Sequence, residues 1–187
     1  MHPKFLGDSY DLVKRSLLAC LRELGPWHVH PMFATRYDDD LIQRYQHLLG
    51  VELITTDPIP ARPWRQDHIA LAHQFGNVLF DPDTGLKCAG FGRAARRFLC
   101  LDELLDAAHA RPAAITCVFD QSLSHGQSRP ELQAKANKLH ELGLPSFAYY
   151  SHACFVFASV NTTRLEAAHD LLIQAGLPEC RLLRGRA

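Results

Sequence analysis

The stretch AITCVFD, residues 114–120, decides the fold class because it is apolar over nearly its whole length and then ends in an aspartate. A strand with one face in water alternates apolar and polar residues, whereas an unbroken apolar strand indicates burial on both faces. Helix-forming stretches lie on either side of it, LDELLDAAHA at 101–110 and RPELQAKANKLHELG at 129–143. Strands separated by helices require crossover connections, so this part of the chain predicts a parallel sheet between two layers of helices.

The rest of the chain repeats this alternation of helix and strand. Helices are expected at 8–25, 39–50, 64–76 and 162–176, and strands at 27–33, 51–56, 77–81, 146–150, 154–160 and 179–183. The strands at 146–150 and 154–160 are close enough to form an antiparallel hairpin. We therefore predict a single α/β domain over residues 1–187, with a three-layer, doubly wound, mostly parallel sheet and an antiparallel edge hairpin.

The composition sets bounds on the partners of the chain. Its 187 residues are 47% hydrophobic, enough for one sizeable core, and 20 basic residues balance 20 acidic ones. Without net charge the molecule has no overall attraction for nucleic acid or an anionic membrane, so such a contact requires a local patch. No apolar run approaches the roughly 18 residues of a membrane helix. The stretch MHPKFLGDSYD at the N-terminus lacks the apolar core of a signal peptide, which predicts a cytoplasmic protein without a membrane partner and leaves its oligomeric state open.

Cysteines and histidines keep a metal site open without defining one. The six cysteines form no C-x-x-C pair and mostly lie among apolar residues, which favours reduced, buried thiols over disulfides or structural zinc. His28 and His30 alternate along an expected strand and so share one side of it, where two imidazoles can bind a metal of unknown identity if a third ligand joins them. His125 and His152 lie in expected loops, either as proton carriers or as polar surface.

Aspartates stand where two of the expected strands end. Asp81 and Asp83 flank a proline after one strand, and Asp120 closes the strand at 114–120. In open α/β sheets, ligands bind beyond the carboxyl ends of the strands. A carboxylate there can orient a substrate amine, hold Mg²⁺ or Mn²⁺, or act as a general base, whereas the structural alternatives are turn formation and helix capping. If the two strands are neighbours, Asp81 and Asp120 are expected to face one crevice and to share an ion.

A basic stretch with two glycines follows the acidic turn. The sequence LKCAGFGRAARRF, residues 86–98, combines an aromatic residue with Arg93, Arg96 and Arg97. Arginine binds phosphate and an aromatic side chain stacks on a base, so the stretch predicts a local basic loop that contacts a nucleotide or a nucleic acid. A solvated surface loop is an equally good interpretation, because the stretch does not match the phosphate-binding G-x-x-x-x-G-K-[ST] pattern.

The segment GDSYDLVKRSLL, residues 7–18, resembles the N-terminal segment of the bacterial adenine-amine methyltransferases that act on large-subunit ribosomal RNA. Gly7, Asp8, Asp11 and Lys14 keep the order of the corresponding residues in that family. The sequence DPDT, which begins at Asp81, half resembles the Asp-Pro-Pro-Tyr catalytic loop of the same enzymes. The expected hairpin is also similar to the end of class I methyltransferase sheets, which carry a reversed strand.

The resemblance implies a Rossmann-like, class I methyltransferase fold with S-adenosylmethionine as cofactor. It also implies that Asp81 and the carbonyl group of Pro82 accept hydrogen bonds from the target amine. Two parts of the family pattern are missing. Asp83 and Thr84 replace the second proline and the aromatic residue of the catalytic loop, and residues 27–40 contain no glycine for the loop that holds the cofactor.

Three functions follow from these residues. The first is a methyltransferase-like protein acting on a nucleobase, nucleotide or nucleic acid, in which Asp81 orients the amine, Asp8 and Lys14 line the site, and the three arginines hold phosphates. The second is a Mg²⁺- or Mn²⁺-dependent phosphodiesterase or nuclease, in which Asp8 and the three strand-end aspartates gather the ions that compensate their repulsion. The third is a non-catalytic binding or regulatory module on the same fold.

Overall fold

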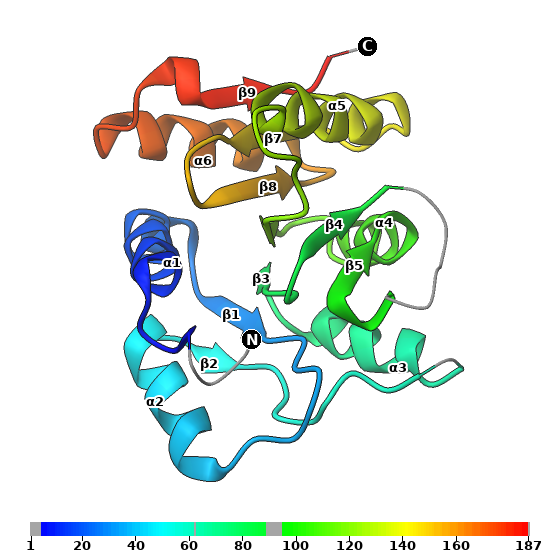
Figure 1. Ribbon diagram of the computed structural model, residues 1–187. Coiled ribbons are helices and arrows are strands. Elements are labelled where there is room, and N and C mark those ends of the chain that lie inside the picture. The colour runs from blue at the N-terminus through cyan, green and yellow to red at the C-terminus, as the bar shows by residue number, and fades with distance from the viewer. Residues whose placement is uncertain (1–4, 62, 89–94, 187) are drawn as a thin grey trace.

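The computed structural model of the protein describes residues 5–61, 63–88 and 95–186 (Figure 1). A seven-stranded sheet has the strand order β2-β1-β3-β6-β8-β7-β9. In that order the strands are Glu52–Leu53, Trp27–His30, Asn77–Phe80, Thr116–Asp120, Cys154–Ala158, Ser146–Tyr149 and Leu182–Arg184. The first four are parallel, β8 is antiparallel to β6 and β7, and β9 is antiparallel to β7. The predicted α/β class with a mostly parallel sheet is confirmed.

Helices cover both faces of this sheet, with α1, α2 and α6 on one face and α3, α4 and α5 on the other (Figure 1). Their bounds are Ser9–Cys20, Asp39–Leu49, Thr162–Gln174, Arg65–Ala70, Leu101–His109 and Ser128–Glu141, respectively. Neighbouring residues of β6 enter different cores, since Phe119 packs with the first group of helices and Val118 with the second. This double burial explains why the strand is apolar without alternation.

Several expected helices are shorter or divided. The side chain of Asp8 caps α1, but the helix ends at Cys20 and the 3₁₀ turn η2 (Arg22–Leu24) follows it. The expected helix at 64–76 divides into α3 and η3 (Leu71–Gln74), and η5 (Glu179–Arg181) precedes β9. Across the described ranges, none of the helices combines the length and the apolar character that crossing a membrane requires.

The pairing register places the two strand-end aspartates on opposite faces of the sheet. Phe80 of β3 pairs with Val118 of β6, so Asp81 is level with Phe119. Asp120 lies one residue further along, and successive side chains of a strand point to opposite faces. Asp81 therefore points toward α1 and α2, whereas Asp120 points toward α5. The expectation that the two carboxylates face one crevice is wrong because of this one-residue offset.

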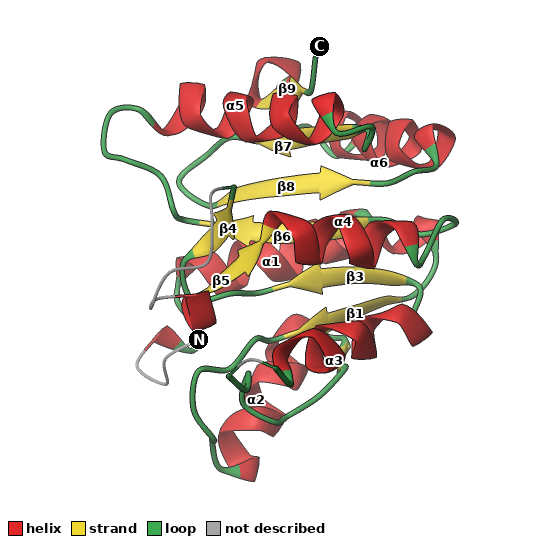
Figure 2. Cartoon of the chain, turned by 90° about the vertical axis from the view of Figure 1, so that its right-hand side faces the viewer, coloured by secondary structure: helices red, strands yellow, loops and turns green. Residues whose placement is uncertain are grey.

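A second, two-stranded parallel sheet, β4 (Gly85–Lys87) and β5 (Phe98–Cys100), lies beside β6 (Figure 2). The sequence indicated a basic loop here, because such short strands give little β signal. The 3₁₀ turn η4 (Ala95–Arg97) leads into β5. The backbone N–H of Thr84 donates to the carbonyl oxygen of Arg97 at 2.9 Å, and the N–H of Gln121 donates to that of Thr84 at 2.9 Å. These bonds fix the turn after β3 against the end of β6.

Candidate functional site

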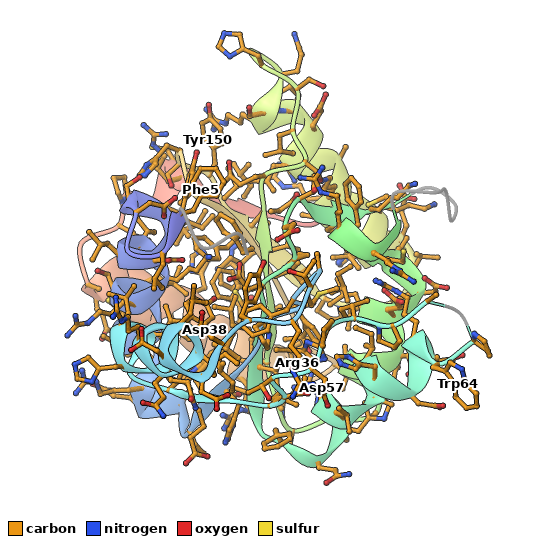
Figure 3. All side chains as sticks on the ribbon, turned by 60° about the horizontal axis from the view of Figure 1, so that its bottom comes forward. Phe5, Arg36, Asp38, Asp57, Trp64 and Tyr150 are labelled. Atoms are coloured by element: carbon orange, nitrogen blue, oxygen red, sulfur yellow. The ribbon has the colours of Figure 1, made fainter. Side chains whose placement is uncertain are left out.

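A pocket of about 660 Å³ lies beyond the carboxyl ends of β3 and β6, and is called the strand-end pocket below. The start of α1, the turn after β3 and the residues at the end of β6 form its walls. Phe5, which is 50% exposed, contributes to it from the surface (Figure 3). Its charged lining comprises the carboxylates of Asp8, Asp11, Asp81 and Asp83 and the cations Lys14 and Arg97.

Lys14 joins two buried carboxylates in this pocket. Its Nζ donates to Oδ1 of Asp11 at 3.0 Å and to Oδ2 of Asp81 at 2.8 Å, and it lies 4.3 Å from the centre of the Phe119 ring. Burial on its own lowers the pKa of Lys14, but the charges and hydrogen bonds of Asp81 and Asp11 outweigh it, and the pKa is raised above its ordinary value. Lys14 therefore remains a cation that holds Asp81, and it is not a free base.

Tyr45 of α2 is the second partner of Asp81. Its buried hydroxyl donates to Oδ2, the same oxygen that Lys14 contacts. Burial, together with the charges of Asp81 and Asp11, raises the pKa of Tyr45 well above its ordinary value, so the hydroxyl remains a donor. The sequence interpretation missed Tyr45. The available signal was its place on the apolar face of α2 with Ile42 and Leu49, where a buried hydroxyl requires a partner.

Asp81 differs from the other buried carboxylates in the hydrogen bonds of its two oxygens. The described chain buries four carboxylates, those of Asp11, Asp81, Glu103 and Asp120. In Asp11, Glu103 and Asp120, both oxygens accept hydrogen bonds. In Asp81, Oδ2 accepts two hydrogen bonds, whereas Oδ1 accepts none from the described residues. Because Asp81 lines the strand-end pocket, Oδ1 is an acceptor left for a ligand.

Three aromatic rings, those of Phe5, Tyr10 and Phe119, line the same pocket. The ring centres of Tyr10 and Phe119 are 5.6 Å apart, and the ring of His152 stacks on Tyr10 at 5.6 Å. The carbonyl oxygen of His152 accepts a hydrogen bond from Nε2 of Gln121 at 3.1 Å. The turn between β7 and β8 therefore reaches the pocket, and the aromatic faces suit a planar ligand.

The remaining predicted residues lie partly in the pocket and partly outside it. Asp8 lines it, but its Oδ1 accepts two backbone hydrogen bonds at the start of α1, at 2.9 and 3.1 Å. Asp83 and Arg97 also line it. Arg96 is exposed on η4 and is not part of the lining, and Arg93 lies outside the described residues.

Asp120 belongs to a separate cluster on the other face of the sheet. Lys135 of α5 donates to Oδ2 of Asp120 at 2.6 Å and to Oγ of Ser122 at 2.6 Å. Oδ1 of Asp120 accepts from the backbone N–H of Leu86 at 3.2 Å and from Ser122. This cluster ties β4 to the end of β6, and Asp120 has no place in the lining of the strand-end pocket.

The described residues do not assemble a metal site at the strand ends. The three ligand-type side chains of the described chain that come within 4.8 Å of one another are Glu166, His169 and Asp170 of α6. The carboxylate of Glu166 already has a cation, because Arg184 pairs with it at 2.5 Å. The rings of the predicted pair His28 and His30 do share one side of β1, but they pack on Phe75 and Phe80.

His30 is expected to make the stability of the fold depend on pH. The residue is buried, with Nε2 at 3.2 Å from the carbonyl oxygen of His68, and burial is the main cause that lowers its pKa from 6.5 to about 3. The folded chain keeps this imidazole neutral while the unfolded chain protonates it below pH 6.5. Its contribution is therefore fully present above that pH and is lost as the pH falls toward 3. Between pH 7.5 and pH 5, we expect urea titrations to show a loss of about 2 kcal/mol through this residue.

The variant His30→Phe provides the comparison for this prediction. It removes the titrating group while keeping a ring against Phe80, so its free energy of unfolding should change less between the two pH values. Equal changes in the wild-type protein and in the variant would show that His30 is not the source of the pH dependence.

The loop after β1 does not fit the way in which the resembling family holds S-adenosylmethionine. That family uses a glycine-rich loop at this place. Here Met32 and Phe33 are 1% and 0% exposed, so this loop carries bulky side chains packed into the two cores and no glycines. Ala34 is the residue of this loop that lines the strand-end pocket.

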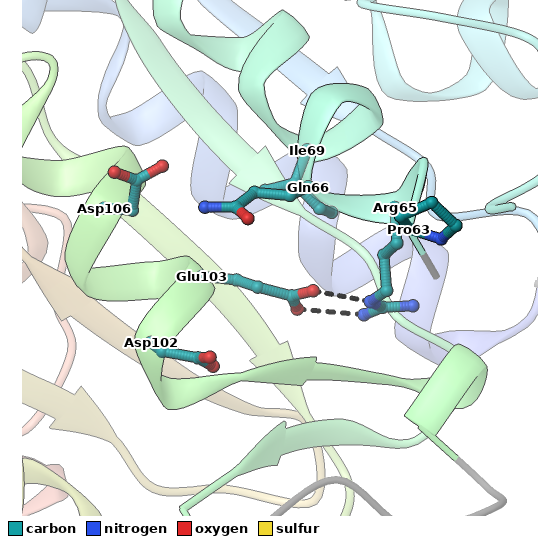
Figure 4. Close-up of a pocket in the computed structure, with 7 residues that line it drawn as sticks. All are labelled: Pro63, Arg65, Gln66, Ile69, Asp102, Glu103 and Asp106. Carbon is teal, nitrogen blue, oxygen red and sulfur yellow. Dashed lines mark hydrogen bonds and ion pairs between the residues drawn. The ribbon is translucent and has the colours of Figure 1, made fainter. Parts of the chain in front are cut away.

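A smaller pocket of about 320 Å³ lies between α3 and α4 (Figure 4). In it, Nε of Arg65 donates to Oε1 of Glu103 at 2.5 Å, and Nη2 donates to Oε2 at 2.9 Å. Nη2 also donates to the carbonyl oxygen of Phe98 at 2.6 Å, and Oε2 accepts from the N–H of Cys100 at 2.8 Å. This pair, which the sequence interpretation missed, links α3 and α4 to β5 and is structural.

Comparisons with known proteins gave no match. No protein family, no curated protein and no solved structure is similar enough to this chain to be matched with it. The assignment of a function therefore depends on the contacts in the strand-end pocket.

Proposed function

We propose that the strand-end pocket binds a nucleobase, carried by a nucleotide or a nucleic acid, and that Asp81 accepts a hydrogen bond from the exocyclic amine of the base. The observation that carries this proposal is Oδ1 of Asp81, which accepts no hydrogen bond from the described residues and belongs to a side chain in a pocket lined by three aromatic rings. An ionised carboxylate accepts hydrogen bonds and donates none, so it selects a group that carries N–H. Aromatic side chains stack on the face of a base. A base with an amino group satisfies both parts of the pocket.

The other polar residues of the pocket support this role of Asp81. Lys14 remains a cation and Tyr45 remains a donor, so both hold the carboxylate and neither competes for the proton of a ligand. Pro82 lines the pocket next to Asp81, as the resemblance implies. Arg97 is a cation of the lining that is placed to meet a phosphate group attached to the base.

The pocket and the sheet also support the resemblance to the methyltransferases. Residues from both resembling motifs meet in one pocket, although Lys14 and Asp81 are 67 positions apart in the sequence. Strand β8, antiparallel between β6 and β7, corresponds to the reversed strand that the resemblance implies. S-adenosylmethionine supplies the methyl group in that family. Because the loop after β1 does not fit its binding mode, we derive no step that involves the cofactor.

The metal-dependent phosphodiesterase has less support among the described residues. Clustered carboxylates attract a metal ion when no other cation compensates their charge. Here Lys14 lies at 3.0 Å from Asp11 and 2.8 Å from Asp81, and Lys135 lies at 2.6 Å from Asp120. The strand-end aspartates also lie in two clusters on opposite faces, so they do not converge on one ion.

The proposal is tested with pairs of ligands in which the exocyclic amine is exchanged for an oxygen and the adjacent ring nitrogen changes from an acceptor to an N–H donor. Adenosine carries an amine where inosine carries an oxygen, and cytidine differs from uridine in the same way. We expect the amino members to bind at least about tenfold more tightly, because an oxygen that faces Oδ1 places two acceptors against each other. Isothermal titration calorimetry should also show that Asp81→Asn binds both members of a pair about equally, since an amide donates as well as accepts.

A matched control separates the role of Asp81 from a general effect of charge. Asp67→Asn removes the same charge from an exposed position on α3 and should keep the preference for amino groups. Equal affinity of the wild-type protein for the two members of each pair, or no binding of any of the four nucleosides, would contradict the proposal. Because the loop after β1 does not fit the binding mode of that family, a parallel titration with S-adenosylmethionine is expected to show no binding heat, whereas measurable heat would favour methyl transfer.

A further inference from the structure

We infer that Tyr45 is a positioning residue, whose hydroxyl occupies Oδ2 of Asp81 together with Lys14 so that Oδ1 faces the ligand. The inference rests on the proposed function of the strand-end pocket. It assigns a role to a residue that lies behind the pocket and is not part of its lining.

The surroundings of Tyr45 indicate that its hydroxyl serves Asp81. The side chain is 0% exposed, belongs to the same apolar core as Ile42 and Leu49, and has the ring of Phe33 at 6.2 Å. A phenylalanine would fill the same space. A buried hydroxyl costs free energy unless it is hydrogen-bonded, and the hydroxyl of Tyr45 has its hydrogen bond with Asp81. The packing of the core therefore does not require a tyrosine at this position, whereas the hydrogen bond to Asp81 does.

Two donors on one oxygen determine which way the carboxylate faces. Lys14 has a long side chain whose ammonium group follows the carboxylate if it rotates. The phenol ring of Tyr45 is held by packing and comes from a different helix, so its hydroxyl defines a fixed direction. Together they keep Oδ2 inside and leave Oδ1 on the side of the pocket.

Asp120 provides the internal comparison for this arrangement. Its Oδ2 accepts from Lys135, as Oδ2 of Asp81 accepts from Lys14, but its Oδ1 is also occupied, by Leu86 and Ser122. Both aspartates are strand-end residues paired with a lysine of a covering helix. They differ in that donors saturate both oxygens of Asp120, whereas both donors to Asp81 share a single oxygen.

The experiment measures selectivity, which a purely structural tyrosine would not affect. In Tyr45→Phe, the carboxylate can exchange its oxygens, so affinity for adenosine should fall roughly tenfold and the preference for adenosine over inosine should fall by a similar factor. The control Phe33→Leu disturbs the same packing without touching a polar group. It should lower the melting temperature but keep the preference. An unchanged preference in Tyr45→Phe, or an equal loss in Phe33→Leu, would overturn the inference.

A second measurement does not depend on any ligand. The carboxyl-carbon NMR signal of Asp81 should move in Tyr45→Phe, because one donor to Oδ2 is lost, and should stay in place in Phe33→Leu. An unmoved signal in Tyr45→Phe overturns the role of Tyr45. If no nucleoside binds the wild-type protein, the proposed function fails instead, so the two failures are told apart.

Discussion

Replacing Lys14 by methionine is expected to lower the free energy of unfolding by about 3–5 kcal/mol, the usual cost of removing one partner from a buried ion pair. The change leaves the carboxylates of Asp11 and Asp81 buried next to each other without a cation. Urea denaturation followed by circular dichroism measures the effect.

An exposed ion pair of the same chain serves as the control. Arg44 pairs with Asp40 at 2.8 Å, and their side chains are 69% and 71% exposed. Solvent screens such a pair, so Arg44→Met should change stability by no more than about 1 kcal/mol. Equal effects of the two substitutions would show that burial does not strengthen the ion pairs of Lys14.

Alanine at position 85 is the second change with a large expected effect, a loss of about 3 kcal/mol or more. A Cβ added to Gly85 would lie 2.0 Å from Oδ1 of Asp120, and the φ of +140° is one that side chains rarely adopt. The carboxylate cannot move aside freely, because Lys135 and Ser122 hold it. Thermal and urea melts of Gly85→Ala measure the loss.

Two other glycines separate the clash from the backbone strain. Gly143 has a φ of +79° with nothing within 4 Å of an added Cβ, so Gly143→Ala shows the cost of a positive φ alone, about 1–2 kcal/mol. Gly76→Ala serves as the second comparison. The nearest atom to its added Cβ would be the carbonyl oxygen of Pro26 at 3.6 Å, an ordinary contact without a clash. A Gly85→Ala variant that is no less stable than Gly143→Ala would refute the close approach to Asp120.

Much of the fold could be predicted from local pattern. The unalternated strand at 114–120 needs a helix layer on each face, and the described sheet has both. The face of the sheet on which Asp120 lies could not be predicted. It depends on the pairing register of the strands, and a shift of one residue moves a side chain to the opposite face. The strands Gly85–Lys87 and Phe98–Cys100 were also missed, since three-residue strands carry too little pattern to be recognised.

Residues of the candidate site could be predicted only where a general rule or a resemblance applies to their position in the sequence. The rule that ligands bind beyond strand ends pointed to Asp81, and the resemblance added Asp8 and Lys14, which line the same candidate pocket. Tyr45 follows no such rule, because its partner is 36 positions away and becomes evident only after the helix has packed. The prediction for Arg93 falls outside the described residues.

The contact between Lys14 and Asp81 has a consequence for how the chain acquires its pocket. Apart from Ala34, the lining residues lie before residue 15 or after residue 80, so a partial chain that stops short of β3 lacks one wall of the pocket, however well its first helix forms. Binding competence then marks the moment at which the opening helix docks onto the central strand. A nucleoside that recognises the pocket would thus double as a reporter of that docking during refolding.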